Sequence, residues 1–130
     1  MITMEELKEK IGGVFYFATV EGDAPRVRPF GFMMVFEEKL YFGCGTHKAA
    51  CRALLENPNA EICAFNKGTF VRVRGRAVFD DRPEVQEAMY AAAPFLKESY
   101  NEKNGRHHIC FYLQDLSAME FRGTEGVKLI

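Results

Sequence analysis

Short runs of apolar residues alternating with polar ones cover most of the chain, and turn residues separate these runs. This period of two is typical of β-strands that have one buried face. Strands are therefore expected over residues 14–20, 26–36, 40–44, 60–65, 69–79, 108–113 and 118–121. Because proline cannot donate to a strand ladder, Pro29 indicates that the second strand lies at a sheet edge or contains a bulge.

Helical periodicity, with apolar residues three or four positions apart, is found in three other segments. The first segment begins at a Thr3–Glu6 capping box and ends at Gly12. The second follows residues 40–44 with Thr46 as its expected N-cap, and the third begins near Pro83. The expected apolar faces of the second and third helices are Ala50, Cys51, Leu54 and Leu55, and Val85, Ala88, Met89 and Ala92.

Hairpin turns join most of the expected strands, and helices occur only at a few crossovers. Such an order does not suit a parallel, doubly wound sheet. It predicts a mainly β protein, an antiparallel barrel of six or seven strands with packed helices. A chain of 130 residues without a linker-like segment is expected to form one domain.

The composition narrows the classes of partner. A formal net charge of −1 argues against general attraction to nucleic acid or to an anionic membrane. No apolar run approaches the roughly 20 residues that span a bilayer. The N-terminal residues lack the basic and apolar regions of a signal peptide, so a cytoplasmic protein is expected.

The four cysteines are expected to be reduced and structural, since most of them lie on apolar faces. One alternative is a metal site, because Cys44, His47 and Cys51 form a C-x2-H-x3-C array within the range of zinc-ligand spacings. That site would need a fourth ligand from Cys63, Cys110 or the histidine pair at 107–108. Since Cys51 is also required on the apolar face of its helix, no metal site is predicted.

A candidate phosphate site lies where the strand over 40–44 ends and the second helix begins. Glycine residues precede Thr46, His47 and Lys48, and a helix N-terminus presents free amides and the positive end of its dipole. Together these groups are suited to binding a phosphate. The alternative is an ordinary capped helix with a lysine in solvent.

Arginines occur in two strands. Arg26 and Arg28 lie on one face of the second strand, where guanidinium groups could bind phosphate or simply keep an edge strand soluble. Arginines at 72, 74 and 76 alternate with apolar residues, which indicates a solvated outer face. A ligand phosphate, a partner subunit or RNA are the alternatives for that face, although Thr69 stands where an RNA-binding sheet motif has an aromatic residue.

The adjacent His107 and His108 are expected to point to opposite faces of a strand, one packed and one exposed. No arrangement of serine, histidine and carboxylate, or of cysteine and histidine, has a local signature. If the protein is an enzyme, a cofactor must therefore supply its chemistry.

The order of these parts resembles the pyridoxamine 5′-phosphate oxidase-like superfamily of FMN-binding split β-barrels, in particular its short single-domain bacterial members. The matching stretches are Phe17-Ala18-Thr19-Val20, Arg26-Val27-Arg28-Pro29-Phe30, Leu40-Tyr41-Phe42-Gly43, Thr46-His47-Lys48, Asn57-Pro58 and Phe70-Val71-Arg72-Val73-Arg74-Gly75-Arg76-Ala77. They cover most of the chain between residues 14 and 79.

The resemblance implies a split β-barrel of Greek-key type, with residues 1–130 as a single FMN-binding domain. It also implies a homodimer with the cofactor site at the subunit interface. The residues that the resemblance assigns to FMN are Arg26, Val27, Arg28, Pro29, Phe42, Gly43, Thr46, His47 and Lys48.

Two departures from the true oxidase argue against oxidation of pyridoxamine phosphate. Phe70 stands where the oxidase has an amide, and residues 121–128 lack its C-terminal arginine and histidine pattern. We therefore expect a flavoprotein oxidoreductase that passes electrons from a reduced nicotinamide through FMN to a small acceptor. The alternative is a non-catalytic barrel that holds a flavin-like ligand or nucleic acid.

Overall fold

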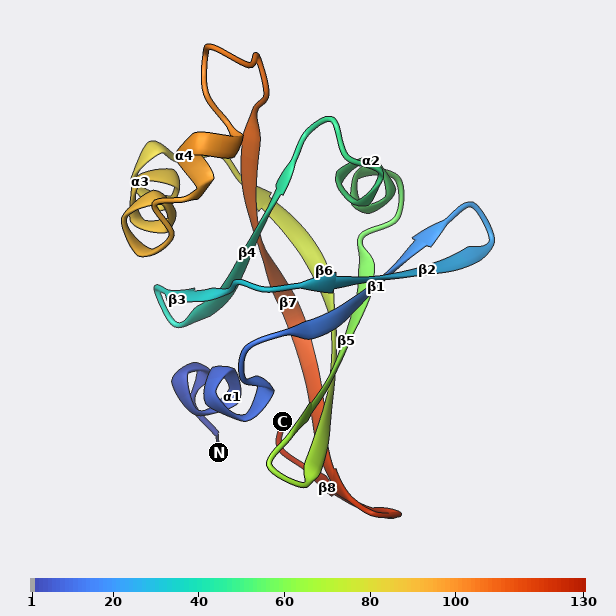
Figure 1. Ribbon diagram of the computed structural model, residues 1–130. Helices are drawn as coiled ribbons and strands as arrows, with labels where there is room; N and C mark the ends of the chain where they lie inside the picture. Colours follow the sequence, from blue (N-terminus) through green and yellow to red (C-terminus); the bar gives the residue numbers. More distant parts are fainter. Residues whose placement is uncertain (1) are drawn as a thin grey trace.

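The computed structural model describes residues 2–130 and contains four helices and eight strands in that range (Figure 1). The helices are α1 (Met4–Ile11), α2 (Ala49–Glu56), α3 (Pro83–Ala92) and α4 (Leu96–Ser99). The strands are β1 (Phe15–Glu21), β2 (Ala24–Phe30), β3 (Met34–Phe36), β4 (Lys39–Gly45), β5 (Asn59–Asn66), β6 (Thr69–Asp80), β7 (His108–Arg122) and β8 (Glu125–Lys128).

All strand pairs are antiparallel and belong to one sheet with the order β2-β1-β5-β6-β7-β4-β3, and β8 pairs with β7. The sheet curls around its own core, with helices packed outside it (Figure 1). The predicted mainly β split barrel is therefore confirmed. The strand with Pro29 is at one end of the sheet order, as expected for a proline that cannot donate.

Three segments differ from the prediction. The strand expected over 26–36 is broken at residues 31–33, so that β2 pairs with β1 and β3 pairs with β4. The strands expected over 108–113 and 118–121 are one strand, β7. Asp115 adopts a positive φ of 55° near a register shift between Arg74 and Arg76. The strand continues through this irregularity, so the polar residues there do not end it. The unclassified tail forms β8.

Aromatic rings fill the centre of the barrel. Phe15, Phe17, Phe42 and Phe111 are fully buried, and the ring centroids of Phe17 and Phe42 are 5.5 Å apart. Helix α1 adds Leu7 and Ile11 to this core, and its predicted capping box is confirmed. The strand alternation that predicted an inner face therefore holds across β1, β4 and β7.

A second apolar cluster lies outside the barrel, where α3 packs on the outer side of β4 and β7. It contains Tyr41, Val85, Met89 and Cys110. The expected faces of two helices need correction. Leu55 is 65% exposed because α2 buries Ala53 instead, and Ala92 is exposed at the end of α3.

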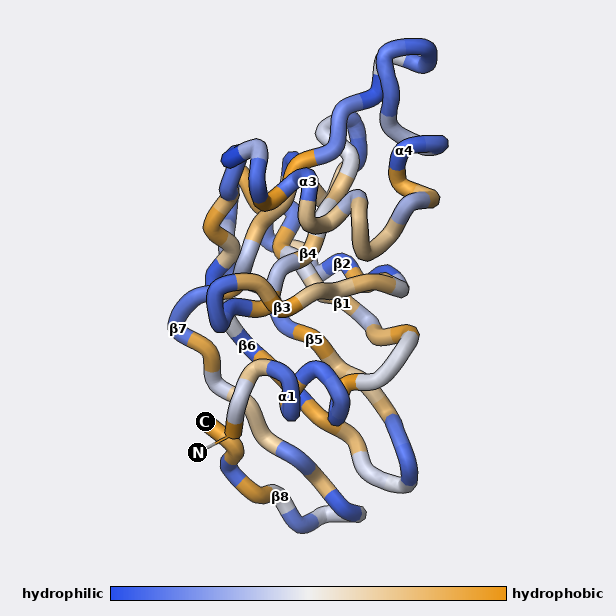
Figure 2. Tube along the Cα trace, turned by 90° about the vertical axis from the view of Figure 1, so that its left-hand side faces the viewer, coloured by the Kyte–Doolittle hydropathy of each residue, from blue (hydrophilic) through white to orange (hydrophobic). Residues whose placement is uncertain are grey.

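The loop that joins α4 to β7 is hydrophilic throughout (Figure 2). Every helix within residues 2–130 is too short or too polar to cross a membrane.

Candidate functional site

A cavity of about 430 Å³ lies between the segment that follows β2, the end of β4, the start of α2 and helices α3 and α4. We call it the Gly43 cavity. It is lined by Arg28, Pro29, Phe30, Gly31, Phe32, Gly43, Cys44, Gly45, Lys48, Ala50, Met89, Phe95, Leu96, Tyr100 and His108. This volume is within the range of small-molecule sites, and none of these lining residues carries a carboxylate.

The cavity brings together four of the nine residues that the sequence suggested for the cofactor: Arg28, Pro29, Gly43 and Lys48. The other five do not line it: Arg26, Val27, Phe42, Thr46 and His47. Strand alternation separates the two groups in part. Phe42 points into the barrel core, so the next residue, Gly43, faces outward to the cavity.

Arg28 is held by a neighbour on β1. Its Nη1 donates to Thr19 Oγ1 over 2.9 Å, and Thr19 is buried. Arg26 lies farther along β2, where it forms an exposed ion pair of 3.4 Å with Glu21. Val27 faces the other side of the strand and is exposed. Of the two arginines, Arg28 is therefore the one that the strand directs to the cavity.

The start of α2 differs from the prediction that Thr46 is the N-cap. The helix begins at Ala49, and Lys48 is the N-cap residue without a side-chain capping bond. Thr46 is held elsewhere: its amide donates to the carbonyl oxygen of His107 over 2.9 Å, and its hydroxyl approaches the same oxygen at 3.4 Å. The amides in the first turn of α2 therefore have no side-chain acceptor.

Gly45 allows two rings to approach the end of β4. A Cβ on this residue would lie 2.7 Å from carbon atoms of both His47 and Tyr100. The two ring centroids are 6.2 Å apart. The main-chain oxygen of His47 accepts a bond of 2.7 Å from Arg52 Nη1. These contacts fix the turn that carries Lys48 beside the cavity.

Sequence reasoning did not place His108 in the site. The expectation of one packed and one exposed histidine is confirmed, since His108 is buried and His107 is exposed. The pairing of β7 with β4 sets His108 opposite Gly45 and next to Gly43. The two glycines of β4 leave room for a ring from the neighbouring strand, but this becomes visible only when the pairing is known.

The cysteines are free thiols, and three of them, Cys44, Cys51 and Cys110, are buried. Burial raises the pKa of the Cys110 thiol to about 12 and also raises the pKa of Cys44. Both thiols are thus protonated at neutral pH. Within residues 2–130, histidines, cysteines and carboxylates do not gather in groups of three or more that could hold a metal.

A polar network joins the turn between β3 and β4 to the start of α3. The Tyr41 hydroxyl donates to Asp80 Oδ2 over 2.6 Å, and Arg82 bonds both Asp80 and Glu37. The Arg82 guanidinium holds the pKa of Asp80 well below its usual range. Burial raises the pKa of Tyr41 to about 12. This network anchors the start of α3, and the same helix carries the cavity residue Met89 farther along.

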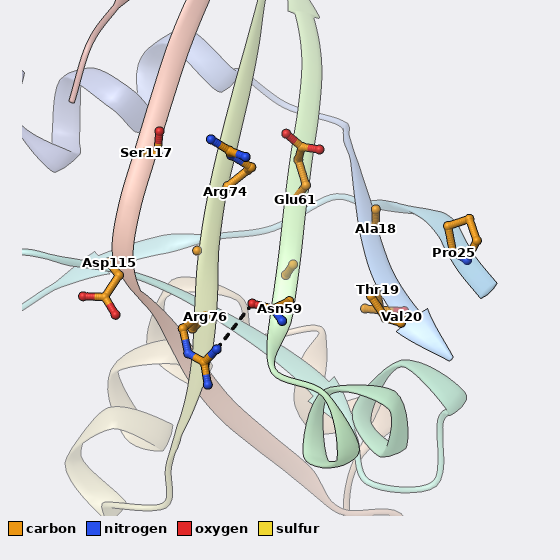
Figure 3. Close-up of a pocket in the computed structure, with 12 residues that line it drawn as sticks. Ala18, Thr19, Val20, Pro25, Asn59, Glu61, Arg74, Arg76, Asp115 and Ser117 are labelled. Carbon is orange, nitrogen blue, oxygen red and sulfur yellow. Dashed lines mark hydrogen bonds between the residues drawn. The ribbon is translucent and has the colours of Figure 1, made fainter. Parts of the chain in front are cut away.

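A second hollow, of about 560 Å³, lies on the outer face of β1, β5, β6 and β7 (Figure 3). Arg74 and Arg76 point from β6 to this face, and Arg76 reaches Asn59 Oδ1 at 3.5 Å. The predicted outward row of arginines is confirmed. Because Glu61 and Asp115 also line this hollow, its charges are mixed, and it is less suited to an anion than the Gly43 cavity.

The fold and sequence are similar to those of known proteins. Residues 4–120 match the family model for pyridoxamine 5′-phosphate oxidase. A NimC/NimA family protein from Clostridium acetobutylicum is 36% identical with a TM-score of 0.81, over 93% of this chain and 87% of that one.

Two more distant structures share the fold. General Stress Protein 26 from Bacillus anthracis is 17% identical with a TM-score of 0.71, over 95% of this chain and 98% of its own. A pyridoxamine 5′-phosphate oxidase-related, FMN-binding protein from Nostoc punctiforme is 20% identical with a TM-score of 0.62, over 88% of this chain and 78% of its own. A search of curated proteins gives no match.

Proposed function

Since the chain belongs to the pyridoxamine 5′-phosphate oxidase family, we propose that it is a flavoprotein that binds FMN in the Gly43 cavity. One observation carries the proposal: Arg28, Lys48 and the uncapped start of α2 come together around one cavity. The cavity therefore combines cations and amide donors with apolar walls.

The cations and amides fit the phosphate of FMN. The first turn of α2 contains no acidic residue, and Ala50 in that turn lines the cavity. A helix N-terminus without a capping side chain offers its amides to an anion, and its dipole adds favourable potential. Lys48 adds a positive charge at the same position, and Arg28 adds a planar donor from β2.

The apolar walls fit the flavin ring. The cavity is lined by Phe32 from the segment that follows β2, and by Met89, Phe95 and Leu96 from α3 and the segment that follows it. Flat ligands of largely apolar character are held by such walls with a few polar contacts. When bound, FMN supplies the redox chemistry that these side chains lack.

The activity that this site supports is transfer of electrons from a reduced nicotinamide to a small acceptor. The Cys44 thiol of the cavity is not an activated nucleophile, since burial raises its pKa. Oxidation of pyridoxamine phosphate is not proposed. Phe70 stacks on Phe121 with centroids 4.8 Å apart and supplies no amide there, and residues 121–128 lack the arginine and histidine pattern of the oxidase.

We propose a homodimer that pairs through the outer face of the sheet. Tyr16 and Phe65 are 54% and 75% exposed on this face. On the same face, Glu61 and Arg72 form an ion pair of 3.2 Å. A surface that mixes apolar side chains with both charges can pair with a second copy of itself across a two-fold axis.

The test of the proposed site is the Lys48→Ala variant, titrated with FMN and with riboflavin, which lacks the phosphate. A charge-assisted hydrogen bond contributes about 1.5–3 kcal/mol, so FMN affinity should fall roughly tenfold to a hundredfold. Riboflavin affinity should hardly change, because without a phosphate Lys48 has no partner in the ligand. Reduced nicotinamide, mixed with the FMN-loaded wild type without oxygen, should bleach the flavin; a non-catalytic binder would keep its colour.

The matched control is Lys103→Ala, which removes an exposed lysine from the loop before β7. It should leave both affinities at the wild-type value. If Lys48→Ala loses affinity for FMN and riboflavin equally, or loses affinity for neither, the phosphate binds elsewhere.

A further inference from the structure

A buried imidazole faces the Gly43 cavity from β7. His108 is 9% exposed, and its ring occupies the space beside Gly43. A Cβ on Gly43 would collide with the Nε2 and Cε1 atoms of this ring. The glycine is therefore what allows the Nε2 edge of His108 to reach the cavity.

Gln86 on α3 fixes the orientation of that ring. Its amide nitrogen donates to the main-chain oxygen of His108 over 2.7 Å, and a carbonyl oxygen can only accept. The other end of the same amide, Oε1, therefore faces His108 Nδ1 at 2.8 Å. The Cys110 thiol donates to the same Oε1 over 3.2 Å.

This arrangement determines which ring nitrogen carries the proton. Since Gln86 Oε1 is an acceptor, Nδ1 must be the N–H donor, and neutral imidazole then has a lone pair on Nε2. Among the described residues, no hydrogen bond of Nε2 is found. No buried side-chain nitrogen or oxygen in the described part of the chain lacks a partner, so Nε2 is open to the cavity.

The ring is neutral at physiological pH. Burial lowers the pKa of His108 to about 4. The groups packed around the ring are Gln86 and Cys110, with Tyr90 and Tyr100 at centroid distances of 5.9 and 5.1 Å. None of these is a carboxylate that would stabilise the imidazolium, and Lys48 lines the same cavity.

We propose that His108 is a ligand-binding residue of the Gly43 cavity, whose bare Nε2 accepts a hydrogen bond from an N–H or O–H group of the ligand. Gln86 is the positioning residue that keeps Nε2 an acceptor. The cavity then selects ligands with a donor at this point and disfavours those with a carbonyl or an anionic group there. This inference rests on the proposed function, since FMN carries an imide N–H and ribityl hydroxyls.

The experiment is histidine side-chain nitrogen NMR on ¹⁵N-labelled wild type at neutral pH, with the His108 signals assigned by their loss in His108→Gln. Without ligand, the spectrum should show the tautomer with the proton on Nδ1. In Gln86→Met, which removes the amide but keeps similar volume, this preference should be lost. On addition of FMN to wild type, the Nε2 resonance should move in the direction of an accepted hydrogen bond.

Affinity gives a second readout. His108→Phe removes the acceptor, and FMN should bind up to about tenfold more weakly, as expected for one neutral hydrogen bond. His108→Gln places an amide oxygen near the position of Nε2 and should recover most of the affinity. If His108→Phe does not fold, the wild-type spectra and His108→Gln still decide the question.

A wild-type ring with the proton on Nε2 would overturn the inference, and so would FMN binding that leaves the Nε2 resonance unchanged. If the wild type keeps the Nδ1–H tautomer but does not bind FMN, the proposed function is overturned instead. The flavin is then not the donor to Nε2. The two failures are therefore distinguishable.

Discussion

Replacement of Gly43 by alanine should destabilise the protein through His108. The new Cβ would overlap the imidazole and would lie 3.0 Å from Met89 Sδ. Overpacking of this kind costs about 1–3 kcal/mol. Displacement of the ring also breaks its 2.8 Å bond to Gln86, at about 1 kcal/mol. A stiffer unfolded chain offsets about 0.5 kcal/mol of this, so we expect a net loss of about 1.5–3.5 kcal/mol.

A double-mutant cycle measured by urea unfolding isolates this cause. In His108→Ala the space is free, so adding Gly43→Ala should cost less than about 0.5 kcal/mol, which gives a coupling of about 2 kcal/mol. The control is Gly31→Ala on the same cavity, where a Cβ meets nothing within 4 Å. Additive losses in the cycle, or a Gly43→Ala variant as stable as wild type, would refute the placement of His108 over Gly43.

Three further outcomes are expected in urea unfolding. Thr3→Ala removes the capping box of α1 and should cost about 1 kcal/mol. Tyr41→Phe removes the 2.6 Å bond to Asp80 and should cost about 1–2 kcal/mol, since the ring stays packed. The pKa of the His108 ring is about 4 in the folded protein and 6.5 in the unfolded chain, so burial of the neutral ring costs no stability above pH 6.5. Below pH 6.5 the unfolded chain takes up a proton that the folded protein does not, and the free energy of unfolding decreases as the pH falls towards 4. The free energy of unfolding of the wild type should decrease by about 2 kcal/mol between pH 7 and pH 5, and His108→Gln should lack this part of the pH dependence.

Local chemistry was sufficient to predict several elements. The alternation of apolar and charged residues over 69–79 gives β6 with its arginines outward, and the Thr3–Glu6 capping box gives the start of α1. Pro29 predicts a strand that is at an edge or bulged, and β2 lies at one end of the sheet order. In each case the physical cause lies within a few residues of the effect.

The remaining features depend on contacts between distant segments. Thr46 resembles an N-cap in sequence, but its amide is taken by the carbonyl oxygen of His107 from the other end of the chain. The continuity of β7 depends on the irregular register opposite β6. The position of His108 beside Gly43 depends on the pairing of β7 with β4, which no local pattern specifies.

The most direct test of the FMN site is equilibrium dialysis of the purified wild-type protein against FMN and against riboflavin. We expect saturation at one FMN per chain, with an affinity at least about tenfold above that for riboflavin, because the proposed site places Lys48, Arg28 and the start of α2 around the phosphate. Absence of saturable FMN binding, or equal affinity for the two flavins, would contradict the account.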